Sequence, residues 1–138
     1  MKSVFVETSV LLLAVGGDHP LRAASRRVVA AAEEGMVRLH MSVEGGQEFL
    51  FHRMRRSSAP EAIEQVKQRH RRLGWHPFDV EGLHRAPAHL APGAVRGRAA
   101  VHAATALVAG FDEIVSSDTD FDGIPGLVRL DPATAFES

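Results

Sequence analysis

The sequence predicts an α/β fold, a three-layer domain in which a central, mostly parallel sheet of four or five strands is flanked by helices. Two observations support this class. Short apolar runs alternate with longer segments of helical periodicity, which is the pattern of parallel strands joined by crossover helices. In addition, 138 residues with 45% hydrophobic and 24% charged residues are enough to form one hydrophobic core. We therefore expect a single domain over residues 1–138.

The first half of the chain is expected to contain two strands and two helices. The strands are residues 3–6 and 36–41, both short and mostly apolar. A helix over residues 18–34 is indicated by a capping aspartate and an early proline at its start, and by Gly35 after its end. The next helix covers residues 42–56, although two glycines in its first turns lower the helix propensity.

The second half continues the alternation. Ser58 and Glu61 have the spacing of a capping box around Pro60, which predicts a helix over residues 60–73 that ends at Gly74. The remaining elements are a short segment at 75–78, a helical piece at 81–90, a loop at 91–93, a helix at 98–109, and strands at 113–116 and 127–130.

Composition excludes several classes of function. The chain has no cysteine, which excludes disulfides and thiolate metal sites. Its longest apolar run, residues 10–15, is far shorter than the ~20 residues that span a membrane, so we expect a soluble, cytoplasmic protein. With 16 basic and 17 acidic residues the net charge is −1, and any attraction for nucleic acid must therefore be local.

Acidic residues follow two of the predicted strands. Glu7 ends the first strand, and Asp118, Asp120 and Asp122 come directly after the strand at 113–116. Because ligands of parallel sheets bind beyond the carboxyl ends of the strands, these acids are expected to meet in one crevice. Glu48, inside a helix among apolar neighbours, can join them. A buried acid without a partner is costly, and oxygen ligands without cysteine suit a hard ion such as magnesium or manganese.

Each acid also has an ordinary structural interpretation. Glu7 could cap a helix that follows it, since acids favour helix N-termini. The three aspartates could be turn residues, and Glu48 could lie at a solvated helix edge. Taken one at a time, these interpretations are common. The joint pattern is what favours a site.

Four segments resemble PIN-domain proteins of the VapC toxin type, the ribonuclease half of bacterial toxin–antitoxin pairs. They are VFVETSVLLLAV at 4–15, MSVEGGQEFLFHRM at 41–54, GRAAVHAATALVAG at 97–110 and IVSSDTDFDGIPGLVRLDP at 114–132. Their order and spacing match the family over essentially the whole chain. The last two segments are the most specific, because the family combines this type of helix, strand, aspartate pair and terminal Leu-x-Pro.

The resemblance implies a set of site residues. The family has an aspartate where this chain has Glu7, a glutamate matching Glu48, an aspartate at the position of Ala99, and a last aspartate matching Asp118. Family hydroxyls fall on Ser9 and Ser116, and Asp120 is a further metal-ligand candidate. In the family these acids hold magnesium or manganese, which activates water to cut an RNA phosphodiester.

Two of these positions depart from the family pattern. Glu7 is one methylene longer than aspartate, which moves its carboxylate by ~1.5 Å where catalytic groups usually need placement within ~0.5 Å. Ala99 removes one negative charge, and Asp120 and Asp122 are candidate substitutes from a different element. The resemblance therefore implies an impaired nuclease, either naturally degenerate or deliberately changed.

RNA would also have to be bound. The candidate phosphate contacts are Arg53, Arg56, Arg96 and Arg98. The basic residues of the two helices at 42–73 could equally form a solvated face. We expect His102 to support helix packing or the acids rather than to ligate a metal.

The resemblance further implies a homodimer neutralised by a small VapB-like antitoxin whose tail, often with an arginine, enters the acidic groove. The rival hypothesis is a catalytically inactive PIN domain that binds RNA or an antitoxin. A phosphatase of another doubly wound fold is disfavoured, because the residues after Glu7 lack the acid or nucleophile that such enzymes use.

Overall fold

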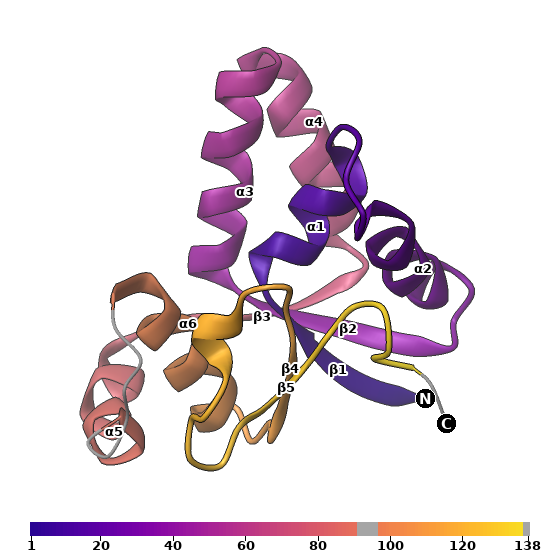
Figure 1. The fold of residues 1–138 in the computed structure, drawn as a ribbon. Coiled ribbons are helices and arrows are strands. Elements are labelled where there is room, and N and C mark those ends of the chain that lie inside the picture. Colours follow the sequence, from indigo (N-terminus) through magenta and orange to yellow (C-terminus); the bar gives the residue numbers. More distant parts are fainter. Residues whose placement is uncertain (91–96, 137–138) are drawn as a thin grey trace.

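A computed structural model describes residues 1–90 and 97–136 of the chain. It contains a five-stranded, all-parallel sheet in the order β3-β2-β1-β4-β5 (Figure 1). The strands are β1 (Lys2–Val6), β2 (Val37–Ser42), β3 (Leu73–His76), β4 (Glu113–Val115) and β5 (Val128–Leu130). The helices are α1 (Thr8–Val15), α2 (Arg22–Glu33), α3 (Val43–Arg56), α4 (Ala59–His70), α5 (Val80–Leu90) and α6 (Gly97–Val108), with a 3-10 helix η1 (Thr119–Phe121).

The sheet separates two layers of helices, as expected. In Figure 1, α1 to α4 lie on one side of the sheet and α5 and α6 on the other. Side chains of β1 alternate between the two faces: Val4 and Val6 belong to one core cluster, and Phe5 belongs to the other. The α/β class, the parallel sheet and the three layers are therefore confirmed.

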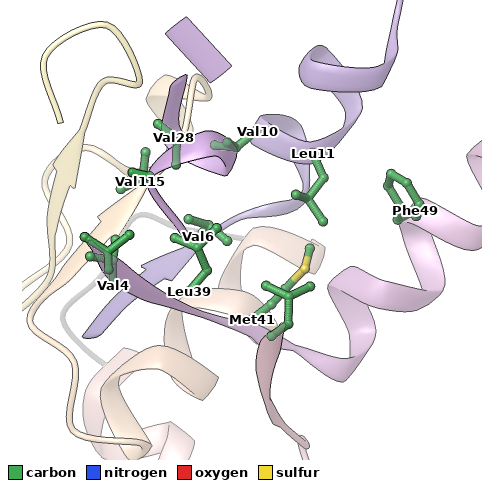
Figure 2. Close-up of a cluster of buried hydrophobic side chains, with 12 residues drawn as sticks. Val4, Val6, Val10, Leu11, Val28, Leu39, Met41, Phe49 and Val115 are labelled. Carbon is green, nitrogen blue, oxygen red and sulfur yellow. The ribbon is translucent and has the colours of Figure 1, made fainter. Parts of the chain in front are cut away.

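The larger core cluster lies between the sheet and helices α1 to α3. Figure 2 shows its centre, where side chains of β1, β2 and β4 meet those of the three helices. Its labelled members are Val4, Val6, Val10, Leu11, Val28, Leu39, Met41, Phe49 and Val115. This packing holds the start of α1 and the first half of α3 against the same end of the sheet.

Three elements differ from the sequence-based expectations. Helix α1 was not expected, because its run of apolar residues shows no polar face at helical spacing. Helix α2 begins at Arg22 rather than at residue 18. Residues 73–76 form β3, which begins two residues before the expected segment at 75–78, because they pair in parallel with β2 and bury Leu73. Helix α4 accordingly ends at His70 and not at residue 73. Gly74 is needed in β3, since a Cβ would lie 2.4 Å from His40 Nδ1.

Most other boundaries agree with the expectations to within three residues. The helices expected at 42–56 and 98–109 are α3 and α6, and Gly35 and Gly110 follow helices with positive φ angles of 77° and 90°. The loop expected at 91–93 lies outside the described residues. Throughout residues 1–90 and 97–136, no helix combines the length and apolar character needed to cross a membrane.

Candidate functional site

Glu7 lies at the junction between β1 and α1. Its backbone N–H donates to the carbonyl of Val115 at 2.9 Å, which extends the pairing of β1 with β4. Its side chain then caps α1, because Glu7 Oε2 accepts a hydrogen bond from Ser9 N at 3.2 Å. The capping interpretation of Glu7 is thus confirmed, and it leaves the second carboxylate oxygen for other partners.

Hydroxyl groups connect Glu7 to the end of β4. Ser116 is fully buried, and its Oγ donates to Glu7 Oε1 at 2.5 Å and accepts from the backbone N–H of Asp118 at 3.0 Å. Ser9 Oγ accepts from Ser117 N at 3.2 Å and lies 3.5 Å from Ser116 Oγ. We call Glu7, Ser9, Ser116 and Asp118 the strand-end cluster. The structure therefore brings together four of the residues that the sequence predicted for the site.

The aspartates after β4 have different surroundings. Asp118 and Asp120 are exposed, and Asp118 Oδ1 accepts from Asp120 N at 2.9 Å, which caps η1. Asp122 is instead bound by Arg129, whose Nε donates to Asp122 Oδ1 at 2.7 Å. The turn interpretation of Asp118 is therefore confirmed. The Asp122 carboxylate is paired with Arg129 instead of joining the strand-end cluster.

Glu48, on α3, has partners of its own. Its Oε1 accepts from Thr8 Oγ1 at 3.0 Å and lies 2.8 Å from His102 Nε2, while its Oε2 accepts from Arg98 at 3.3 Å. Only 22% of the Glu48 side chain is exposed, so these contacts stabilise a mostly buried carboxylate. The solvated-edge interpretation of Glu48 is therefore wrong.

A buried serine completes this second group. Ser42 Oγ lies 2.8 Å from His102 Nδ1 and also accepts from Gly45 N at 2.9 Å, which caps α3. Both ring nitrogens of His102 thus have partners, and the ring is held between Ser42 and Glu48. We call Thr8, Ser42, Glu48, Arg98 and His102 the Glu48 cluster. His102 supports an acid, as expected.

Position 99 adds no charge to either cluster. Ala99 lies in the first turn of α6, half-buried, and packs against the smaller core cluster around Phe5 and Phe121. Helix α6 therefore contributes only Arg98 and His102 to the Glu48 cluster. Where the family resemblance implies an acid beside Glu48, this chain has a cationic and an imidazole partner.

The donor set does not fit a divalent cation as it stands. Among the residues that the structure describes, no group of three or more His, Asp and Glu side chains is placed to hold a metal ion. Both Glu48 oxygens are bound within its cluster, and both Glu7 oxygens accept hydrogen bonds within the strand-end cluster. The magnesium or manganese site expected from Glu7, Glu48, Asp118 and Asp120 therefore has no support in this geometry.

The candidate phosphate-binding arginines fall at different places. Arg53 and Arg56 lie in the last turn of α3, beside the end of α1, and Arg53 Nε donates to Gln65 Oε1 on α4 at 3.0 Å. Arg98 is engaged by Glu48, and Arg96 lies outside the described residues. Of the three described arginines, Arg53 and Arg56 therefore line one hollow, whereas Arg98 lines another beside Glu48.

Sequence reasoning missed Thr8, Ser42 and Arg129. Arg129 on β5 donates to the carbonyl of Ser116 at 3.0 Å and binds Asp122, and these hydrogen bonds hold the chain after β4. The bond to Asp122 raises the pKa of Arg129. Ser42 ends β2, and Thr8 comes shortly after the end of β1. A hydroxyl residue at the end of a strand is therefore the signal that could have identified both.

The fold and these clusters define an α/β protein with a parallel sheet whose first and fourth strands end in acids and hydroxyls at one edge. A family model described as PIN domain matches residues 4–127. The chain belongs to the PIN-domain family.

Comparison with solved structures supports the same fold. A toxin-antitoxin complex from Klebsiella pneumoniae aligns with TM-score 0.69 and 16% identity over 94% of this chain and 97% of that chain. VapBC2 from Rickettsia felis, bound to a DNA fragment from its promoter, aligns with TM-score 0.70 and 11% identity over 94% of this chain and 98% of that chain. VapC20 from Mycobacterium tuberculosis, described as a sarcin-ricin loop cleaving toxin, aligns with TM-score 0.68 and 16% identity over 88% of this chain and 95% of that chain. No curated protein sequence matches the chain.

Proposed function

We propose that this chain is a VapC-like toxin, an RNA endonuclease whose activity is impaired by the residues at positions 7 and 99. One observation carries the proposal: acids lie at the strand ends and on α3 of a PIN fold, but the α3 acid, Glu48, is paired with Arg98 and hydrogen-bonded by His102. The structural neighbours named as VapC and VapBC proteins support the toxin class.

The impairment follows from charge. Phosphodiester cleavage requires neutralisation of the charge that builds on the phosphate, and in this family the expected source is a divalent cation. Without an acid at position 99, the Glu48 oxygens bind protein donors instead. An aspartate at position 99 would restore one negative charge beside Arg98, and would compete with Glu48 for that guanidinium.

The first experiment is RNA cleavage by the chain, by Ala99→Asp and by the double variant Glu7→Asp/Ala99→Asp, each with Mg²⁺ or Mn²⁺ and with a chelator. We expect Ala99→Asp to raise the cleavage rate at least about 100-fold, equivalent to about 2.7 kcal/mol of transition-state stabilisation. Ala100→Asp is the matched control, because it adds the same charge at the next half-buried position of α6. It should leave the rate unchanged.

Two outcomes contradict the proposal. Equal cleavage by the unchanged chain and by Ala99→Asp would show that position 99 does not limit the activity. If no variant cuts any RNA offered, although circular dichroism shows a native fold and calorimetry detects no metal binding, the endonuclease assignment fails.

The rival function is a PIN domain that binds RNA or an antitoxin without catalysis. The ion pair between Arg98 and Glu48 at 3.3 Å favours it, because an arginine already occupies the acid that a metal would need. In either case we propose a homodimer and a VapB-like antitoxin as partners, since several structural neighbours are VapBC complexes. Co-purification with a candidate antitoxin, followed by size-exclusion chromatography with light scattering, tests both.

A further inference from the structure

A hollow of about 650 Å³ lies at the C-terminal end of α1, the end opposite to Glu7 of the strand-end cluster. It is formed by the second half of α1, by the loop at residues 16–19 and by the end of α3, which contributes His52, Arg53 and Arg56. We call it the basic hollow. No residue of the strand-end cluster or of the Glu48 cluster lines it.

The charge balance of the basic hollow favours an anion. Arg53 and Arg56 carry permanent charges, and among the described residues Arg56 has no carboxylate partner. The lining includes one acid, Asp18, which lies 3.7 Å from Arg22 and is thereby partly balanced. Arginines at the end of a helix also complement its dipole, but that effect does not require two of them to face a hollow.

His52 gives a second, independent indication. Its Nδ1 atom is buried and has no hydrogen-bond partner within residues 1–90 and 97–136. A buried polar atom without a partner is costly, so a ligand that draws the ring towards the hollow and bonds Nδ1 would relieve that cost. Burial lowers the pKa of His52, and the charges of the neighbouring Arg53, Arg56 and Arg55 add to the effect.

The hollow continues from the acids along the same helices. On α3, His52 and Arg56 follow Glu48 by one and two turns, which places them about 6 and 12 Å further along the axis. On α1, Leu12 and Val15 follow Thr8, the residue that bonds Glu48, in the same way. An extended polyanion that crosses the acidic site along this direction would therefore reach the hollow.

We propose that the basic hollow binds a backbone phosphate of single-stranded RNA, one or more nucleotides away from the strand-end cluster. This inference rests on the proposed RNA substrate. Apart from Asp18 and the two histidines, His19 and His52, the rest of the lining is aliphatic or glycine, with no Phe, Tyr or Trp ring for base stacking, so we expect the hollow to bind the phosphate rather than the base. Arginine pairs favour phosphate because guanidinium groups bond it through two N–H groups at once.

The test measures binding without cleavage. A fluorescently labelled single-stranded RNA of mixed sequence is titrated in EDTA at several salt concentrations. The test variant is Arg53→Gln/Arg56→Gln. The matched control is Arg55→Gln/Arg71→Gln, which removes the same charge from two exposed positions that do not line the hollow.

We expect the test variant to lose about 10-fold in affinity and to reduce the slope of log K against log salt by about 0.7, which corresponds to the loss of one phosphate contact on a single strand. The control pair should lose less than about 3-fold. The ¹⁵N signals of the His52 ring should shift when RNA is added to the unchanged chain and to the control, but not to the test variant.

Equal losses in the two double variants would overturn the proposal in favour of a diffuse positive field. Absence of RNA binding by the unchanged chain would overturn it as well, and so would binding of poly-glutamate, but not RNA, that depends on Arg53 and Arg56. The outcome for this inference can be distinguished from that for the proposed function. If Ala99→Asp cuts RNA but the test variant binds RNA normally, only the phosphate site in the basic hollow is excluded. If binding depends on Arg53 and Arg56 but no variant cuts RNA, only the endonuclease function is excluded.

Discussion

Glu7 and Glu48 stand near the same edge of the sheet, but their carboxylates are stabilised in opposite ways. Glu7 accepts hydrogen bonds from neutral groups, the Ser9 N–H and the Ser116 hydroxyl. Glu48 is bound by the charged Arg98 and by His102, besides Thr8. Neutral donors stabilise a negative charge without cancelling it, whereas Arg98 cancels part of it. The Glu7 carboxylate therefore keeps its full negative charge among neutral donors, whereas the charge of Glu48 is partly balanced by Arg98.

The strongest test of this comparison is His102→Ala. We expect a loss of about 3 kcal/mol in the free energy of unfolding, because the change leaves a cavity in a buried network and removes a partner from both Glu48 and Ser42. Urea denaturation measures the loss. Arg98→Ala removes the exposed partner of the same carboxylate and should change the stability by less than about 0.5 kcal/mol. Equal effects would show that Glu48 is not held by its buried partner.

The strand-end cluster is tested by Ser116→Ala. We expect a loss of about 2 kcal/mol, because Glu7 Oε1 and the Asp118 N–H both lose the partner that the buried hydroxyl provides. Ser117→Ala is the control, since its backbone N–H bonds Ser9 Oγ and survives the change. The same urea titrations apply. A loss no larger than that of the control would mean that the hydroxyl does not stabilise Glu7.

The capping role of Glu7 predicts a smaller effect. Glu7→Ala should cost about 1 kcal/mol in thermal or urea unfolding, because α1 loses its N-cap acceptor. Glu7→Asp should cost less, since aspartate is among the preferred N-cap residues. If the aspartate variant is the less stable of the two, the shorter carboxylate cannot reach both Ser9 N and Ser116 Oγ, and the extra methylene of Glu7 is required by this site.

Acidification should reveal a third group that belongs to neither cluster. His40 Nδ1 on β2 and His76 Nε2 on β3 lie 3.0 Å apart. Burial lowers the pKa of both rings, and the charges of His76 and Arg38 lower the pKa of His40 further. Between the lowered native pKa and the ordinary value of 6.5, the unfolded chain binds more protons. Stability is therefore complete above about pH 6.5 and declines as the pH falls below it.

Urea unfolding between pH 7.5 and 5.5 measures this decline. His40→Asn/His76→Asn should reduce it, and His52, whose pKa is also lowered, should account for part of the remainder. His19→Asn is the control. An unchanged pH dependence in the double variant would assign the decline to other groups.

Much of the fold was predictable because its signals are local. The strands β1, β2, β4 and β5 are short apolar runs, and α3 and α6 were predicted to within about one residue at each end. Helix α1 was not assigned because its residues are apolar on all sides, although the capping interpretation of Glu7 pointed to a helix there. Strand β3 was expected only as a short segment at 75–78, two residues late, because its start at Leu73 becomes clear only when β2 pairs with it.

The sequence by itself determined which chemical groups this protein has: acids and hydroxyls at strand ends, Glu48 on a helix, alanine at position 99 and arginines at the end of α3. Only the tertiary structure decided which of them meet. His102 and Glu48 are 54 residues apart in the chain and 2.8 Å apart in space, and Ser116 reaches Glu7 across 109 residues. Hydrogen bonds require contact at about 3 Å, which residue types and spacing specify within a helix or turn but not between elements that the sheet and its cores bring together.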